Sequence, residues 1–164
     1  MEGRTFSVDL DEVELPSGRI TERIKVHHPD AVAILPFVAA DKVLLVRQWR
    51  YSIGRETLEI PAGKIKPGED LLECVQRELV EETGYEADNI EHLLSYVPAI
   101  GYSDEILHIF KGTNLKKLPD AEVNSDEITR TEILTVTDLK ERIKRNEVYD
   151  GKTIIALAIV LDNS

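Results

Sequence analysis

The sequence predicts an α+β fold in which helices cover both faces of a mixed sheet, an α/β/α sandwich. Three observations support this prediction. Short apolar runs typical of strands alternate with segments of helical periodicity, turn residues separate these segments, and neither an internal repeat nor a low-complexity linker divides the chain. The 164 residues suffice for one domain with a single sizeable core, so we expect one domain with an N-terminal extension.

The N-terminal extension is predicted to be an antiparallel β-hairpin. Residues 5–15 and 19–27 have strand composition, and the Pro-Ser-Gly sequence at 16–18 is a turn signal between them. An isolated two-stranded hairpin is marginal in water, so this one should pack against, or exchange with, a second copy. We therefore assign residues 1–28 to a dimerisation hairpin and expect a symmetric homodimer.

The main domain, residues 29–164, alternates between strands and helices. Strands are expected, in order, at residues 31–39, 42–50, 57–65, 90–100, 106–115 and 130–139. The third of them should break at Pro61 and Gly63, which disfavour a continuous strand. Helices are expected within the Glu-rich stretch 63–85, then at 138–148 and 150–161.

Composition excludes several classes of partner. Twenty Lys and Arg against 31 Asp and Glu give a formal net charge of −11, which repels nucleic acid and anionic membranes. The longest apolar run, residues 153–161, is far shorter than the roughly 20 residues needed to span a bilayer. A single cysteine, Cys74, and an N-terminus without a secretion signal indicate a cytoplasmic protein.

The Glu-rich helix places two carboxylates toward its apolar side. At 100° per residue, the predicted core-facing stripe contains Leu71, Leu72, Val75 and Leu79. With Val75 at zero, Glu82 falls at about −20° and Glu78 at about −60°. Like charges four residues apart repel, and partial burial increases the cost unless a cation compensates. Arg77 lies about 100° from Glu78, so it cannot screen both carboxylates.

A bound divalent cation would compensate these charges. Mg²⁺ takes oxygen ligands, needs few protein carboxylates and keeps waters and substrate phosphates in its other positions. Gly63 and Gly68 allow sharp backbone turns, so a main-chain carbonyl near Ala62 could also face the metal. The alternative is an acidic solvated helix with ion pairs such as Glu73 to Arg77.

The stretch 63–85 resembles the Nudix box, the signature of hydrolases that cleave a nucleoside diphosphate linked to another moiety. All of the fixed positions are filled, namely Gly63, Glu69, Arg77, Glu78, Glu81, Glu82 and Gly84. The resemblance implies an α/β/α sandwich that uses Mg²⁺, with Mn²⁺ as a substitute. It also implies that Glu78 and Glu82 are the main metal ligands, that the Ala62 carbonyl coordinates, that Glu81 assists catalysis, and that Glu69 and Arg77 orient the ligands.

The flanking sequences, residues 44–65 and 96–110, resemble the ADP-ribose pyrophosphatase branch of this family. Pro98 takes the place of a proline that follows the box, and Gly101, Ser103 and Glu105 lie in a loop that approaches the substrate. The implied reaction splits ADP-ribose, or a related nucleoside diphosphate sugar, into AMP and ribose 5-phosphate. The alternatives are a GDP-mannose or dinucleoside polyphosphate hydrolase, or a non-catalytic metabolite-sensing Nudix domain.

Two further roles are assigned to charged residues outside the box. Arg50 is the best candidate for a phosphate contact, because its planar fork suits bidentate recognition; otherwise it is a rim arginine paired with a carboxylate. Arg47 and Arg55 are weaker candidates. For the catalytic base we favour Glu127, in a loop that also contains Glu122 and Asp126. The four histidines show no ligand spacing and are expected on strands or the surface.

Overall fold

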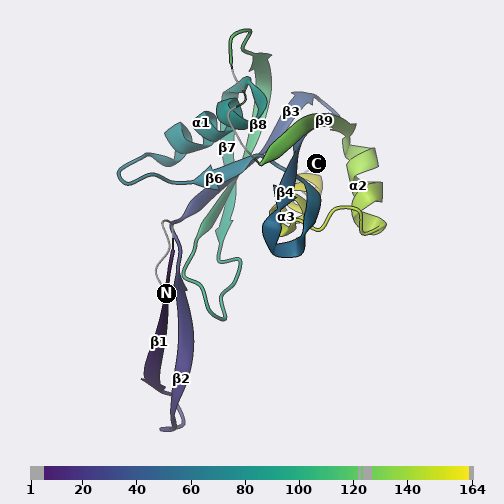
Figure 1. Ribbon diagram of the computed structural model, residues 1–164. Helices are drawn as coiled ribbons and strands as arrows, with labels where there is room; N and C mark the ends of the chain where they lie inside the picture. The colour runs from purple at the N-terminus through teal and green to yellow at the C-terminus, as the bar shows by residue number, and fades with distance from the viewer. Residues whose placement is uncertain (1–5, 122, 124–126, 163–164) are drawn as a thin grey trace.

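The computed structural model describes residues 6–121, 123 and 127–162 (Figure 1). Their strands are β1 (Ser7–Glu14), β2 (Ile20–His27), β3 (Ala31–Ala39), β4 (Lys42–Arg50), β5 (Arg55–Glu59), β6 (Ala62–Lys64), β7 (Tyr85–Tyr96), β8 (Leu107–Lys117) and β9 (Ile128–Thr135). Their helices are the 3₁₀ turn η1 (Tyr51–Ile53) and the α-helices α1 (Leu71–Thr83), α2 (Val136–Lys144) and α3 (Gly151–Asp162).

Within the described residues, seven strands form one mixed sheet. Five follow the order β5-β4-β3-β8-β7, while β6 also pairs with β3 and β9 with β4. Strands β3 and β8 run parallel, and the other neighbouring pairs are antiparallel. Strand β3 is buried along most of its length, as its continuous apolar sequence requires of a strand covered on both faces.

Helices cover both faces of this sheet (Figure 1). On one face Val75 and Leu79 of α1 pack with Ile34 of β3. On the other face Leu139 of α2 and Leu157 of α3 pack with the strands in a second cluster. The predicted α+β sandwich with a mixed sheet is confirmed.

The hairpin β1–β2 forms a separate two-stranded sheet that projects away from the body (Figure 1). Leu10 and Ile24 stand directly opposite one another, and both side chains are exposed. The amide of Val26 donates to the carbonyl of Tyr102 over 2.7 Å, which ties the base of the hairpin to the loop that follows β7. The hairpin itself is as predicted, while its role in dimerisation stays a prediction.

Helix α1 begins and ends at the residues expected of its sequence. The carboxylate of Asp70 accepts from the amide of Leu72 over 2.8 Å, and Gly84 ends the helix in a left-handed conformation with φ 73°. The predicted stripe is wrong at Leu72, which is 52% exposed, whereas Cys74 is fully buried. The buried face is therefore rotated away from Leu72 and toward Glu78 and Glu82.

Several element boundaries differ from the sequence prediction. The strand expected at 57–65 is divided at Pro61 into β5 and β6, as predicted, but the break expected at Gly63 is wrong, because Gly63 lies within β6. The strand expected to reach residue 139 ends at Thr135, whose hydroxyl accepts from the amide of Asp138 and caps α2. Among the helices that are described, none has the length and apolar character needed to cross a membrane.

Candidate active site

A cavity of about 610 Å³ opens where β6, the end of β4, the loop after β7 and the start of α3 meet. Its walls include Arg50, Ala62, Gly63, Pro98, Glu105, Asp150, Gly151 and Lys152. Five positions singled out in the sequence are therefore brought together by segments far apart along the chain, namely Arg50, Ala62, Gly63, Pro98 and Glu105. Gly101 and Ser103 do not line this cavity.

The two inward glutamates of α1 converge on β6. A Cβ atom at Gly63 would lie 2.0 Å from the Cδ of Glu78, so the Glu78 carboxylate occupies the space that only glycine leaves free. The amide of Ala62 donates to Oε2 of Glu82 over 3.1 Å. Both carboxylates thus reach the strand that forms one wall of the cavity.

Arg77 connects the other acidic residues of the box. Its Nε and Nη2 donate to the two carboxylate oxygens of Glu69 over 2.6 and 2.9 Å. Its Nη1 donates to Glu78 over 2.5 Å and to Glu81 over 3.1 Å. Arg77, held by Glu69, therefore orients Glu78 and Glu81 directly, and it pairs with these residues rather than with Glu73, the partner expected on a solvated helix.

Burial dominates the electrostatics of the two inward carboxylates. Glu82 is only 6% exposed, and this burial raises its pKa to about 8. Burial also raises the pKa of Glu78, although the hydrogen bond from Arg77 opposes the shift. A cation bound beside Glu82 would favour the ionised form of this buried carboxyl at neutral pH.

The donors in this region fit a hard divalent ion. Glu78 and Glu82 offer carboxylate oxygens next to the main chain of Ala62, and Mg²⁺ needs few protein ligands of this kind. In the part of the chain that is described, no three His, Cys, Asp or Glu side chains are already gathered around a common point.

A second buried carboxylate, Glu59 of β5, lies behind Arg50 and was not singled out from the sequence. Arg50 donates to it through Nε over 2.7 Å and through Nη2 over 2.5 Å. Lys152 and Thr57 also donate to this carboxylate. Burial alone would raise the pKa of Glu59, but these partners, Arg50 first, lower it to about 2. An acidic residue in the otherwise apolar run LEIPA was the signal for such a partner.

The loop after β7 serves both the cavity and the hairpin. Glu105 lines the cavity, and its Oε1 lies 3.2 Å from Nδ1 of His28, which also lines it. The hydroxyl of Ser103 accepts from the amide of Glu105 over 3.3 Å, while its backbone forms a bridge with Val26 of the hairpin. Ser103 thus supports Glu105, and one histidine expected to be merely a surface or strand residue stands at the site.

The predicted base, Glu127, lies just before β9 and outside the lining of the cavity. Its carboxylate accepts from Nε2 of Gln48 over 2.9 Å, and its carbonyl accepts from the amide of Trp49 over 3.0 Å. These contacts place it beside the end of β4, close enough for its charge to contribute to the raised pKa of Arg50, after the larger effect of Glu59. The alternatives Glu122 and Asp126 lie outside the described residues.

The two weaker arginine candidates have other partners. Arg47 donates to Glu132 of β9 over 2.7 Å. The guanidinium of Arg55 lies over the ring of Tyr149, 4.1 Å from its centroid. Of the three arginines proposed from the sequence, Arg50 alone lines the cavity next to the box.

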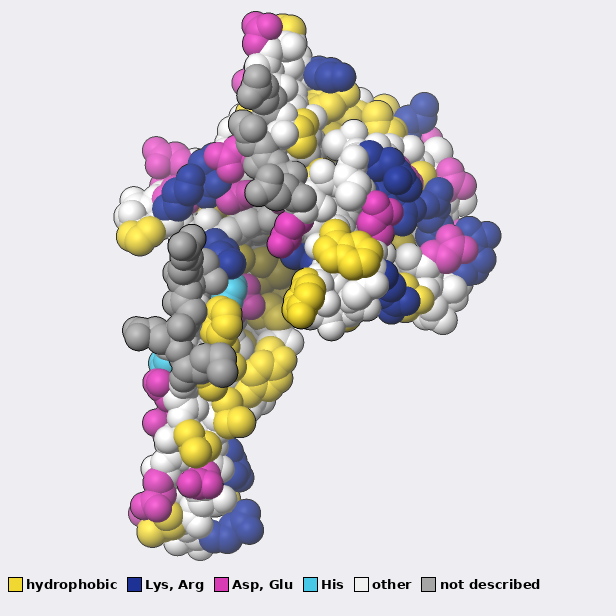
Figure 2. All heavy atoms as spheres, in the orientation of Figure 1, with side chains coloured by type: hydrophobic (Ala, Val, Ile, Leu, Met, Phe, Trp, Pro, Cys, Tyr) yellow, Lys and Arg dark blue, Asp and Glu magenta, His cyan; other side chains and the backbone are white. Residues whose placement is uncertain are grey.

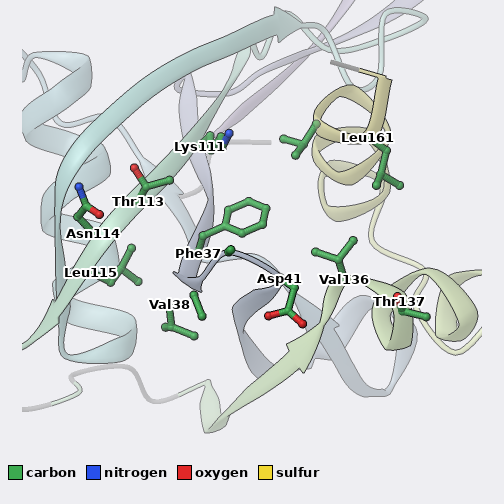
Figure 3. A pocket seen from close by; sticks show the side chains of 13 residues that line it. Phe37, Val38, Asp41, Lys111, Thr113, Asn114, Leu115, Val136, Thr137 and Leu161 are labelled. Carbon is green, nitrogen blue, oxygen red and sulfur yellow. The ribbon is translucent and has the colours of Figure 1, made fainter. Parts of the chain in front are cut away.

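A different hollow, of about 720 Å³, lies between β8 and the adjoining ends of β3, α2 and α3 (Figure 3). Phe37, Lys111, Val136 and Leu161 are among its lining residues, and the ammonium of Lys111 is 5.6 Å from the centroid of the Phe37 ring. None of the box residues lines this hollow. The chemistry implied by the box therefore belongs to the cavity beside β6.

Comparison with known proteins gives a consistent family assignment. The NUDIX domain model matches residues 27–156. A methanol dehydrogenase activator of Bacillus methanolicus is 38% identical over 156 residues, and an ADP-ribose pyrophosphatase of Bacillus subtilis is 36% identical over 156 residues. Each of these alignments covers 94% of this chain and 84% of the relative.

Similarity among solved structures agrees with the fold. A crystal structure of an ADP compounds hydrolase matches 99% of this chain and 88% of its own, with a TM-score of 0.83 and 23% sequence identity. The family model covers most of the chain, and Gly63 of the box lines the cavity beside β6. The chain therefore belongs to the Nudix family.

Proposed function

We propose that this protein hydrolyses the diphosphate bond of ADP-ribose to give AMP and ribose 5-phosphate, with Mg²⁺ or Mn²⁺ as cofactor. The observation that carries the proposal is the convergence of Glu78 and Glu82 on β6, at the wall of a cavity that also contains Arg50. The similarity to the Bacillus subtilis protein named ADP-ribose pyrophosphatase supports the choice of substrate.

The metal would be held by Glu78, Glu82 and the carbonyl of Ala62. When bound, it supplies positive charge that polarises the phosphoryl oxygens and makes an attacking water more acidic. Arg77 fixes the orientation of Glu78 and Glu81. Arg50 contacts the diphosphate from the end of β4, and Glu105 approaches the terminal ribose, with Gly101 and Ser103 shaping its loop.

Glu127 is proposed to take the proton from the attacking water. It lies outside the cavity lining, so its carboxylate must move toward the substrate to come within reach of the attacking water, directly or through one water. Glu127→Gln should lower kcat by roughly 10²-fold or more, with KM changed much less. If Glu127→Gln is nearly silent while Glu105→Gln abolishes turnover, the base is Glu105 instead.

A substrate panel tests the proposed activity directly. Purified protein is incubated with Mg²⁺ and ADP-ribose, GDP-mannose or a dinucleoside polyphosphate, and the products are identified by mass. The expected result is the highest kcat/KM for ADP-ribose, with AMP and ribose 5-phosphate as the only products. A preference for GDP-mannose or a dinucleoside polyphosphate would replace ADP-ribose in the proposal.

A second candidate function is metabolite binding without turnover, as in a regulatory Nudix domain. The similarity to the protein named methanol dehydrogenase activator gives this candidate some support, because that name describes an effect on another enzyme. The complete set of box glutamates favours turnover over sensing. Binding of ADP-ribose by titration calorimetry, with no product formed in the panel, would favour the sensor.

The hairpin is proposed to mediate a homodimer. Phe6, Leu10, Ile20 and Ile24 are exposed on this element, and Figure 2 shows hydrophobic side chains along it. An exposed apolar face on a two-stranded sheet needs a partner, and a second copy satisfies this requirement symmetrically. Light scattering should give the mass of two chains, and Leu10→Glu with Ile24→Glu should give the mass of one. A wild-type monomer with full activity would exclude this assembly.

A further inference from the structure

Four charged side chains connect three elements in the wall of the cavity. Arg50 of β4 pairs with Glu59 of β5, Glu59 pairs with Lys152 at the start of α3, and Lys152 pairs over 2.8 Å with Asp150. Asp150 in turn accepts from the amide of Thr153 over 3.0 Å, within the first turn of α3. The sheet edge and this helix are therefore joined through one buried carboxylate, Glu59.

The side chains of this network differ in exposure, with the anion buried and one of the cations partly exposed. The Glu59 side chain is 3% exposed, whereas the Arg50 side chain is 36% exposed and lines the cavity. The two positive and two negative side chains sum to zero. The network therefore adds no net positive charge for a diphosphate, and its contribution to binding must come from how it orients Arg50.

The pairing with Glu59 fixes which edge of the guanidinium remains available. Glu59 takes the side edge of Arg50, formed by Nε and Nη2. In the described part of the chain, no hydrogen bond from Nη1 is seen, so the end of the fork is left for a ligand. A planar guanidinium can bind a carboxylate on one edge and a phosphate on the other.

We propose that Glu59 is a positioning residue for the diphosphate of the substrate, acting through Arg50, with Lys152 and Thr57 holding Glu59 in place. This inference rests on the proposed function, because it takes a nucleoside diphosphate as the ligand. Its physical basis is pre-organisation: an arginine already fixed on its side edge loses little further conformational freedom when its end edge binds phosphate.

Stability alone is a poor explanation for this network. Buried ion pairs often contribute no more to folding than well-packed apolar residues of similar volume, because desolvation offsets their attraction. The network borders a cavity beside the Nudix box, and a role in substrate binding explains this position. The two explanations differ in what they predict for substrate affinity.

A double-mutant cycle between Glu59 and Arg50 distinguishes the stability explanation from the binding explanation. In the otherwise wild-type enzyme, Glu59→Gln should raise KM for ADP-ribose roughly tenfold and change kcat much less, because the fork loses its orientation. In an Arg50→Met background, Glu59→Gln should have no further effect on KM. An equal effect in both backgrounds would overturn the positioning role.

Glu132→Gln is the matched control. Glu132 also pairs with an arginine of β4, Arg47, over 2.7 Å, and both side chains are partly buried away from the cavity. This variant should lower Tm without changing KM. A rise in KM as large as that of Glu59→Gln would show that the effect is general to the sheet, and the inference would fail.

Two additions make the test independent of turnover and of folding. The first addition is the Kd of the non-hydrolysable α,β-methylene analogue of ADP-ribose, measured with Mg²⁺. If the wild type binds the analogue but does not turn over ADP-ribose, the proposed function alone is overturned. If the wild type does not bind the analogue, both the proposed function and the positioning role of Glu59 are overturned. If Glu59→Gln does not fold, Thr57→Val removes one hydrogen bond to the same carboxylate and should weaken analogue binding several-fold, again only when Arg50 is present. Unchanged binding in Thr57→Val would contradict the inference.

Discussion

Glu59 and Glu82 are two buried glutamates next to one cavity, and they have opposite electrostatics. Their exposures are similar, 3% and 6%. Burial raises the pKa of Glu82 to about 8, but the pKa of Glu59 is about 2 because Arg50, Lys152 and Thr57 outweigh the same effect of burial. Burial is thus common to both residues, and the number of partners decides the charge state.

The difference shows which side of the cavity is complete and which needs a ligand. Glu59 has its cations within the protein and is ionised at any physiological pH. Glu82 accepts a hydrogen bond from the Ala62 amide, but among the described residues no cation forms an ion pair with it, and Arg77 pairs with Glu69, Glu78 and Glu81 instead. A divalent ion would do for Glu82 what Arg50 and Lys152 do for Glu59.

The largest expected effect comes from neutralising Glu82. Glu82→Gln should lower kcat/KM by roughly 10²-fold or more, because a charged metal ligand is lost. The metal-free variant should nevertheless be at least as stable as the wild type at pH 8, since a buried charge is removed. Steady-state kinetics and thermal unfolding measure the two effects. A fully active Glu82→Gln would contradict the metal assignment.

Neutralising Glu59 should, in contrast to Glu82→Gln, lower the stability of the protein. Glu59→Gln leaves Arg50 and Lys152 partly unpaired in a buried place, and breaking such a pair costs roughly 3–5 kcal/mol. Denaturant unfolding measures this loss, with Glu82→Gln as the companion variant. Equal stability changes in the two variants would show that the contrast between the two glutamates is wrong.

The pH dependence of stability should report both groups in the metal-free protein. The pKa of Glu82 is raised from 4.5 to about 8, so stability is lost as pH rises through that interval. The pKa of Glu59 is lowered from 4.5 to about 2, so its contribution is present above pH 4.5 and is lost as pH falls toward 2. Tm measured from pH 5 to 9 should therefore decline more steeply in the wild type than in Glu82→Gln, and Tm measured from pH 5 down to 2 should fall in both proteins as the Glu59 contribution is lost.

The smallest predicted effect is stabilisation by the ion itself. Mg²⁺ at a concentration 100 times its Kd should stabilise the folded protein by about 2.7 kcal/mol. The increase in Tm should be clear at pH 8 in the wild type and much reduced in Glu82→Gln, while Glu132→Gln should respond as the wild type does. An identical response in Glu82→Gln would place the ion elsewhere.

Local sequence patterns determined much of this fold and part of its site. The alternation of strands and helices predicted the sandwich, and the phase of α1 predicted that Glu78 and Glu82 face inward. These features depend on residues close together in the sequence, whose relative directions follow from helical and strand geometry. Leu72 was wrongly predicted to face the core, because a helical wheel gives the direction of a side chain and not whether the sheet extends far enough to cover it.

Only the tertiary structure decided which distant charges meet. Glu59 and Lys152 are 93 residues apart, and the sequence contains 31 acidic and 20 basic residues that could pair in many ways. The sheet order and the position of α3 select one pairing, and they also bring Arg50, Ala62 and Glu105 to the same cavity. The reason is that an ion pair depends on the distance between two side chains in space, and local sequence patterns carry no information on that distance between remote segments.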